Sequence, residues 1–204
     1  MKVRILPVLV LSAALGGCFS VLPEPQIPSA LIALPADRAQ APADPLQTDV
    51  SVYPPDSTRA FAGVDIAVRT DQEMVYLGDV RWVDAAPRLL QNAVVDSLAK
   101  AGGDGRAVTA QIGARVDYEV RWRIIDFSAS RDAGPVRVEV AVSLLDALTR
   151  RMVAQDTFSA TGAPSDRAPR ARAAAPALAA QSVADQVATF VAKSALPKQA
   201  ATVN

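Results

Sequence analysis

The sequence predicts an α+β domain in which a mainly antiparallel sheet, built around a three-stranded meander, is covered by two helices. Three observations lead to this fold class. Three runs of alternating polarity follow one another between residues 117 and 160, an amphipathic helix with clear ends precedes them, and an alanine-rich helix follows them. Short connections between the three runs favour antiparallel neighbours, and the apolar side of such a sheet needs cover.

The meander rests on side-chain alternation. In the first run, 117–128, an apolar set alternates with a polar set, and the two sets are Tyr118, Val120, Trp122, Ile124 and Glu119, Arg121, Arg123. The second run, 136–144, alternates valine with Arg137, Glu139 and small residues, and the third spans 151–160. A period of two places one set on a buried face and the other in water. The charged residues of the first two strands are therefore expected to form cross-strand ion pairs.

The two helices are predicted from their ends and their apolar stripes. Asp84 is the expected N-cap of the first helix, Pro87 lies in its first turn, and Gly102-Gly103 end it. The same glycines lack the lysine-serine pair of a phosphate-binding loop. The second helix spans about 169–196, and Pro176 favours a break or a late start, so that 177–195 is its firm part.

Before the first helix the chain is rich in proline, which restricts it to short strands and extended segments. Residues 30–34 and 49–53 are apolar enough for edge strands. Residues 64–69 and 75–83 are further strand candidates. A domain of residues 30–196 follows, with a proline-rich tether at 18–29 and a disordered tail at 197–204.

The N-terminus has the order of a secretory signal peptide. Lys2 and Arg4 precede an apolar run from Ile5 to Leu15, which is too short to span a bilayer. Leu15-Gly16-Gly17-Cys18 then resembles the bacterial lipobox. This resemblance implies cleavage after residue 17, a diacylglyceryl thioether and an N-acyl chain on Cys18. More than one acyl chain is needed for lasting membrane attachment. An unmodified cysteine after an ordinary signal is the alternative.

Composition excludes several kinds of chemistry. The 204 residues contain 21 basic and 21 acidic side chains, no histidine, and Cys18 as the single cysteine. This balance gives no support for nucleic-acid binding, and one cysteine cannot form an intramolecular disulfide. The commonest general base and metal ligand is absent. We therefore expect no enzyme, no catalytic or metal residues, and no cofactor other than the lipid on Cys18.

Several short motifs in a fixed order resemble those of the ABC-type transport auxiliary lipoprotein component family, which includes the paraquat-inducible lipoprotein. They are Ile66 to Arg69, Tyr76, Arg81-Trp82 and Pro87 to Leu90, followed by YEVRWRIIDF, VRVEVAVSLLD, MVAQDTFSATGA and an alanine-rich helix. The resemblance extends over about 30–196. The proline-rich segment before Val64 matches it only loosely.

The resemblance implies a periplasm-facing domain anchored by lipid to the outer membrane. Phe19 rather than aspartate follows Cys18, which also favours the outer membrane. The implied partners are an ABC transporter and its MCE-domain subunit, in a system that moves phospholipid or other hydrophobic molecules between membranes. Direct phospholipid binding and a homo-oligomer are left open. The alternative is an assembly or activation factor for a lipopolysaccharide or cell-wall complex.

Two residues are candidates for a partner contact. Trp82 and the adjacent Arg81 stand just before the first helix, and tryptophan and arginine are enriched at interface hot spots. Burial in the core is the competing interpretation for Trp82. For Trp122, on the apolar side of an alternating strand, burial is the favoured one. Arg167, Arg170 and Arg172 near the start of the last helix favour a solvated loop over a headgroup contact.

Overall fold

The computed structural model describes residues 27–131 and 134–197. The signal sequence at 1–17, Cys18, most of the 18–29 tether and nearly all of the 197–204 tail lie outside these residues. The described residues form one eight-stranded sheet and two α-helices. The strands are β1 (Ala30–Ile32), β2 (Val50–Val52), β3 (Asp65–Thr70), β4 (Glu73–Trp82), β5 (Ala107–Thr109), β6 (Tyr118–Ser130), β7 (Val136–Asp146) and β8 (Met152–Gly162).

The helices are α1 (Ala86–Ala99) and α2 (Pro169–Ser194). Three 3₁₀ turns complete the elements, namely η1 (Ala36–Arg38), η2 (Arg59–Phe61) and η3 (Ala110–Ile112). The α+β class and the two helices are confirmed. The short strand β5 and the 3₁₀ turns had no counterpart among the predicted elements.

The sheet is mixed, so the prediction of a mainly antiparallel sheet is wrong. The meander itself is present, because β6 pairs with β7 and β7 with β8 in antiparallel fashion, as β3 does with β4. The pairs β1–β4, β2–β5, β2–β6 and β3–β6 are parallel. Alternation along one strand reports which face is buried. It carries no information about which distant strand becomes the neighbour.

The long strand β6 organises the sheet because both of its edges are used. One edge carries β7 along most of its length. The other edge carries two short strands in succession: Val50 of β2 lies opposite Tyr118, and Val68 of β3 lies opposite Ala129. As a result β2 is an inner strand between β5 and β6, whereas the sequence predicted an edge strand there. Of the two proline-flanked strands, β1 is the one at an edge.

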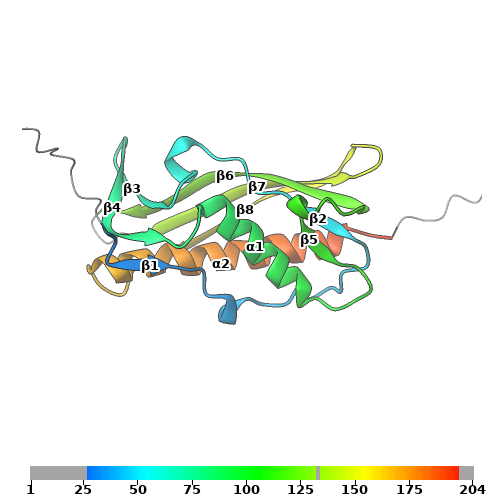
Figure 1. Cartoon of the computed structure of the whole chain (residues 1–204), viewed down its shortest axis with the longest axis horizontal. Helices are drawn as coiled ribbons and strands as arrows, with labels where there is room; N and C mark the ends of the chain where they lie inside the picture. Colours follow the sequence, from blue (N-terminus) through cyan, green and yellow to red (C-terminus); the bar gives the residue numbers. More distant parts are fainter. Residues whose placement is uncertain (1–26, 132–133, 198–204) are drawn as a thin grey trace, which may run out of the picture.

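The helix α2 covers one side of the sheet and runs along the length of the molecule (Figure 1). It packs against β6, β7, β8 and β4, and α1 packs against it in turn. The alternating valines of β7 point into this interface and are buried, as are Val120 and Trp122 of β6. The side of β6–β7–β8 that faces away from α2 carries the polar residues that alternate with the buried ones. One face of the sheet is therefore apolar and the other is polar.

The helix α2 is continuous, so the expected break at Pro176 is absent. Pro176 lies inside the helix and is buried, together with the neighbouring Ala175 and Ala177. A proline removes only one backbone hydrogen bond and bends a helix locally. Burial of alanines on both sides of it against the sheet offsets that cost.

The first helix ends where the sequence predicts. The backbone N–H of Lys100 caps the last turn, and Gly102 and Gly103 follow with φ of 68° and 91°. At its start the N-cap is Ala85 rather than Asp84, although the Asp84 carboxylate accepts a hydrogen bond from the Ala85 N–H at 2.7 Å. Gly103 is tightly placed, because a Cβ there would overlap the backbone carbonyl of Leu46.

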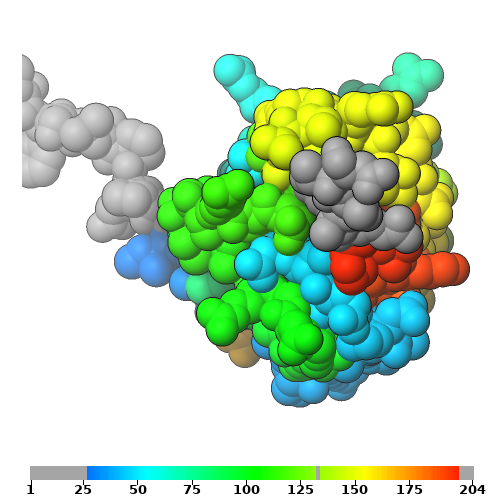
Figure 2. All heavy atoms as spheres, turned by 90° about the vertical axis from the view of Figure 1, so that its right-hand side faces the viewer, coloured from blue at the N-terminus to red at the C-terminus, as the bar shows by residue number. Residues whose placement is uncertain are grey.

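The end of the molecule opposite the tether is closed by contacts between segments distant in sequence. Seen from that end, the loop after α1, the segment leading into β2 and the end of α2 lie side by side (Figure 2). The Gly105 N–H donates to the Leu46 carbonyl at 2.9 Å. The hydroxyls of Thr48 and Tyr118 donate to the carbonyls of Ala195 and Leu196 at 3.0 and 2.8 Å. These bonds fix the residues that directly follow α2.

Replacing Gly103 by alanine tests this closure. We expect Gly103→Ala to lower the free energy of unfolding by at least about 2 kcal/mol, because φ is positive and the new Cβ meets backbone. Gly78→Ala is the matched control: its Cβ would meet no atom within 4 Å and its φ is not positive. Urea titrations of both variants measure the difference. Equal midpoints would contradict the close approach of Gly103 to Leu46.

Candidate functional site

The lipidation candidate Cys18 lies outside the described residues, but the place where its tether meets the domain is defined. The Ser29 N–H and hydroxyl both donate to the Asp79 carbonyl, at 2.6 and 2.9 Å. Asp79 adopts a φ of 62° at this point of β4. The tether therefore leaves beside the β3–β4 hairpin, at the end of the molecule where α2 begins. The end of α2 and the segment after it lie at the opposite end of the molecule (Figure 1).

The two candidate contact residues on β4 point to different sides. Trp82 is 3% exposed, and its ring stacks on Phe127 with 5.2 Å between centroids. Arg81 is exposed and forms a 3.1 Å ion pair with Asp65. The core interpretation therefore describes Trp82, and a partner contact by Arg81 stays a prediction. Trp122 is buried as well, and its indole N–H donates to the Tyr53 carbonyl.

A groove of about 590 Å³ lies between α2, β8 and the segment that follows η1. We call it the α2 groove. Its apolar surface comes from Phe158, Leu178 and Phe190, and the two phenylalanine rings are 5.5 Å apart. Arg38 and Lys193 are on its rim. A hollow of this size is within the range of small-molecule sites, and its chemistry suits an apolar group with a polar end.

Polar side chains hold the walls of the α2 groove in place. The Asp185 carboxylate accepts from the Ser97 hydroxyl at 2.6 Å and from the Gln181 amide at 3.0 Å, which ties α1 to α2. On β8, the Thr157 N–H donates to Asp156, and the Gln186 amide donates to the Ser159 carbonyl at 3.4 Å. The last bond joins α2 to the outer edge of β8. These side chains occupy backbone groups that a further strand would otherwise use.

The sheet surface that faces away from α2 carries a second candidate site. Towards the end of the molecule opposite the tether, the largely buried Glu119 carboxylate accepts hydrogen bonds from Arg121 at 3.0 Å and from Arg150 at 2.7 Å. The Tyr53 hydroxyl donates to the same carboxylate at 3.4 Å. The Arg121 guanidinium also lies over the Tyr53 ring, 3.2 Å from its centroid. One buried acid thus positions two arginines at the surface.

Two further pairs extend this surface along the sheet. Arg69 of β3 pairs with Asp126 at 2.8 Å, and Asp126 also accepts from the Ser128 hydroxyl. Arg137 pairs with Glu139 at 2.8 Å on β7. The hydrogen bond from Arg137 to Glu139 raises the pKa of the Arg137 guanidinium above its ordinary value. We call the surface formed by Arg69, Arg121, Arg123, Arg137 and Arg150 the arginine face.

The sequence identified most of these charges but not their partners. Cross-strand pairs between β6 and β7 were expected. Instead Arg121 pairs with Glu119 and Arg137 with Glu139 along the same strand, and the pairs that join separate segments involve Arg150 and Arg69. The register explains this, because Arg121 lies opposite Ser143 and Arg123 opposite Ala141. No signal in the sequence marked Arg69 or Arg150 as members of this surface.

The arginines near the start of α2 are partly structural. Arg172 donates to the Ser130 carbonyl at 3.0 Å, and Arg170 donates to the Ser29 carbonyl at 3.3 Å. Arg167 is exposed. The first two tie the helix to the end of β6 and to the tether exit, which a solvated loop would not do. Their cost next to the positive end of the helix dipole is offset by these hydrogen bonds.

Residues 27–131 and 134–197 contain neither a metal-binding cluster nor a membrane-spanning helix. No group of three or more side chains there is arranged to hold a metal ion. None of the helices in these ranges combines the length and apolarity that crossing a membrane requires. The α2 groove and the arginine face are thus the two surfaces with distinctive chemistry in the described part of the chain.

Comparison with known proteins decides the family. A family model described as the ABC-type transport auxiliary lipoprotein component matches residues 31–188. The chain belongs to this family. Membership confirms the resemblance noted from the motifs, and implies a membrane-anchored envelope lipoprotein with a role in ABC-type transport systems. The family is not a class of enzymes.

Solved structures show the same fold for this auxiliary lipoprotein. Protein XCC0632 from Xanthomonas campestris, a DUF330 protein, superposes with a TM-score of 0.69 at 22% identity over 81% of this chain and 93% of that one. An uncharacterised protein of known crystal structure superposes with a TM-score of 0.57 at 14% identity, over 75% of this chain and 99% of that one. No protein of curated function matches the sequence.

A double-mutant cycle tests the Glu119 centre. We expect Arg121→Ala and Arg150→Ala to cost about 1 kcal/mol each in unfolding free energy. The double variant should cost more than their sum by about 1 kcal/mol, because the buried carboxylate then keeps only the Tyr53 hydroxyl. Arg88→Ala, which removes an exposed pair with Asp84, is the control and should cost under about 0.5 kcal/mol. Additive costs in urea titrations would contradict a shared buried acid.

Proposed function

We propose that this auxiliary lipoprotein is the outer-membrane subunit of an ABC/MCE-type system that transports lipid or another hydrophobic compound between the two membranes. Acyl chains on Cys18 hold it at the periplasmic face of the outer membrane. The domain acts by binding protein partners of the transporter, including the MCE-domain subunit, and not by catalysis. The observation that carries the proposal is the family match over residues 31–188, preceded by a lipobox-like Leu15-Gly16-Gly17-Cys18.

The position of the tether exit supports a peripheral, anchored subunit. Cys18 and Ile27 are separated by nine peptide units, which span at most about 30 Å. The helix α2 has 26 residues and a length of about 39 Å. Because the tether leaves at one end of this helix, the domain can hang from the membrane with its opposite end in the periplasm. Its sides are then free to contact other subunits.

Substitution of Cys18 tests the anchor. In cells labelled with palmitate, we expect label in the wild-type protein and none in Cys18→Ala, and the variant should appear in the soluble periplasmic fraction. Cys18 forms no disulfide, since it has no second cysteine to pair with, so the folded domain should melt at an unchanged temperature. An unlabelled wild-type protein, or a variant that remains in the outer-membrane fraction, would refute the lipid anchor.

The transport role needs a separate readout. Affinity purification of the wild-type lipoprotein from solubilised envelopes should recover an ATPase, a permease and an MCE-domain protein, identified by mass spectrometry. Recovery should require native membranes but no added nucleotide. Recovery of only lipopolysaccharide or cell-wall assembly proteins would overturn the proposed transport function and leave the anchor intact.

A further inference from the structure

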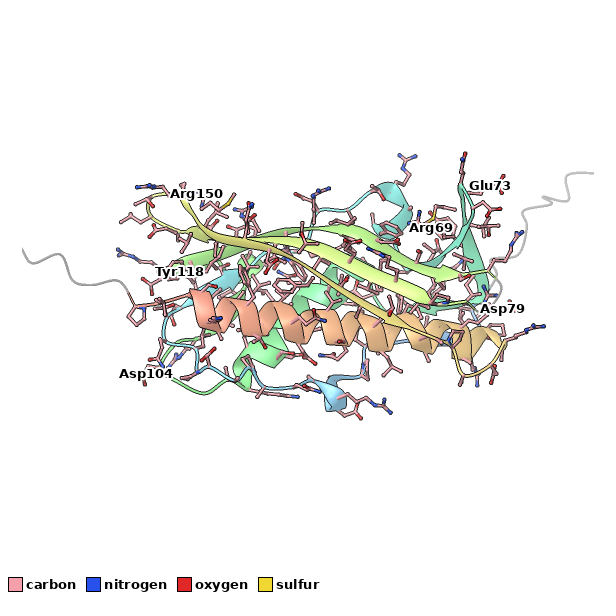
Figure 3. All side chains as sticks on the ribbon, turned by 180° about the vertical axis from the view of Figure 1, so that it is seen from behind. Arg69, Glu73, Asp79, Asp104, Tyr118 and Arg150 are labelled. Carbon is pink, nitrogen blue, oxygen red and sulfur yellow. The ribbon has the colours of Figure 1, made fainter. Side chains whose placement is uncertain are left out.

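The arginine face is a sheet surface that neither α-helix covers in the described part of the chain. β6, β7 and β8 bury their apolar side against α2, and their other side faces away from both helices, with η2 next to it beside β6 and β3 (Figure 3). Arg150 and Arg69 lie on this open side, towards opposite ends of the molecule (Figure 3). An antiparallel sheet often has one side in water, so openness alone does not indicate a partner. The distribution of charge does.

In each ion pair of the arginine face, the carboxylate is largely buried and the guanidinium is exposed to solvent. The arginine side chains of these pairs are 40–57% exposed, and the carboxylate side chains are 11–19% exposed. In the pairs elsewhere the carboxylate is exposed too: the side chains of Asp65 and Asp84 are 44% and 41% exposed. Arg123 is also exposed and forms no ion pair within the described residues. The surface is therefore positive although the chain as a whole is balanced.

Beside the arginines, the sheet surface is hollowed. Two rows cross the strands: Arg121, Ser143 and Gln155 in one, and Arg123, Ala141 and Thr157 in the other. The small side chains of β7 leave a depression of about 340 Å³ over β7 and β8, which is lined by Ala141, Val142, Ser143, Gln155, Asp156 and Thr157. The register places Arg121 and Arg123 of β6 next to the β7 side of this hollow, and Gln155 and Thr157 of β8 line its other side. A carboxylate-bearing side chain would find both space and donors there.

We propose that the arginine face binds an acidic segment of a protein partner, with carboxylates seated against Arg121 and Arg123 over Ala141 and Ser143. This deepens the proposed function, on which the identity of the partner as a transporter subunit rests. A symmetric contact with the same face of a second copy is disfavoured, because it would bring two positive surfaces together. The face runs from Arg69 near the tether exit to Arg150 at the far end (Figure 3), so it lies along the side of an anchored domain. That placement fits a protein segment better than a bilayer.

Site-specific photo-crosslinking in cells tests the surface with the full lipoprotein. The photo-crosslinker p-benzoylphenylalanine replaces Thr157 in the test protein and the exposed Asn92 of α1 in the control. We expect an adduct with a protein from position 157 only, and the crosslinked peptide of that protein should carry a surplus of aspartate and glutamate. In the Thr157 protein, Arg123→Glu should reduce adduct yield about tenfold, and Arg88→Glu on α1 should leave it unchanged.

A second variant separates shape from charge. Ala141→Leu fills the hollow without changing charge, and it should also reduce the yield while the melting temperature stays that of the parent protein. The proposal is overturned if position 157 gives no protein adduct, or gives adducts to phospholipid or to a second copy only. It is also overturned if Arg123→Glu leaves the adduct yield unchanged. An acidic partner outside any ABC system would leave the arginine face established and would refute the proposed transport role.

Discussion

The close packing of α2 against one side of the sheet is the constraint on which the rest of the structure depends. The buried positions of α2 are mostly alanine, with Val183, Val187 and Val191 among them. Small side chains let the helix axis approach the sheet closely, so the branched side chains of β6 and β7 fill the space between the two layers. No disulfide can replace this contact in a chain with one cysteine. The domain therefore depends on this apolar packing and on the hydrogen bonds that tie α2 to the rest of the chain.

This packing also decides which surfaces are left for function. Because α2 and α1 stack on the same side, the opposite side of β6–β7–β8 needs no apolar residues and can carry charge. The Glu119 carboxylate, buried within that charged side, orients Arg121 and Arg150. The outer flank of α2 forms the α2 groove with β8. The helix α2 thus leaves two separate surfaces exposed, the positive arginine face and the amphipathic α2 groove. Both can be reached by partners when the domain is anchored at its N-terminal end.

Local sequence patterns predicted the elements better than their partners. Alternation from Tyr118 to Ile124 gave β6 and its buried face, and the glycines after α1 gave the end of that helix. These features depend on backbone geometry within a few residues. Other features depend on contacts between residues distant in sequence. They are the parallel pairing of β2 and β3 with β6, the pairing of β5 with β2, and the continuation of α2 through Pro176. Neither the secondary-structure propensity of a segment nor its hydrophobic period carries information about those contacts.

For the candidate sites, the sequence by itself determined the chemistry of the residues and the face on which each strand places them. It supplied the lipobox-like motif before the domain, the absence of histidine and the charged alternation of β6 and β7. Only the tertiary structure decided that Trp82 stacks inside on Phe127, that Arg69 and Arg150 join the arginine face, and that its acids are withdrawn while its arginines are exposed. Exposure and pairing are properties of neighbours in space, and folding brings these neighbours from segments as distant as residues 53, 119 and 150.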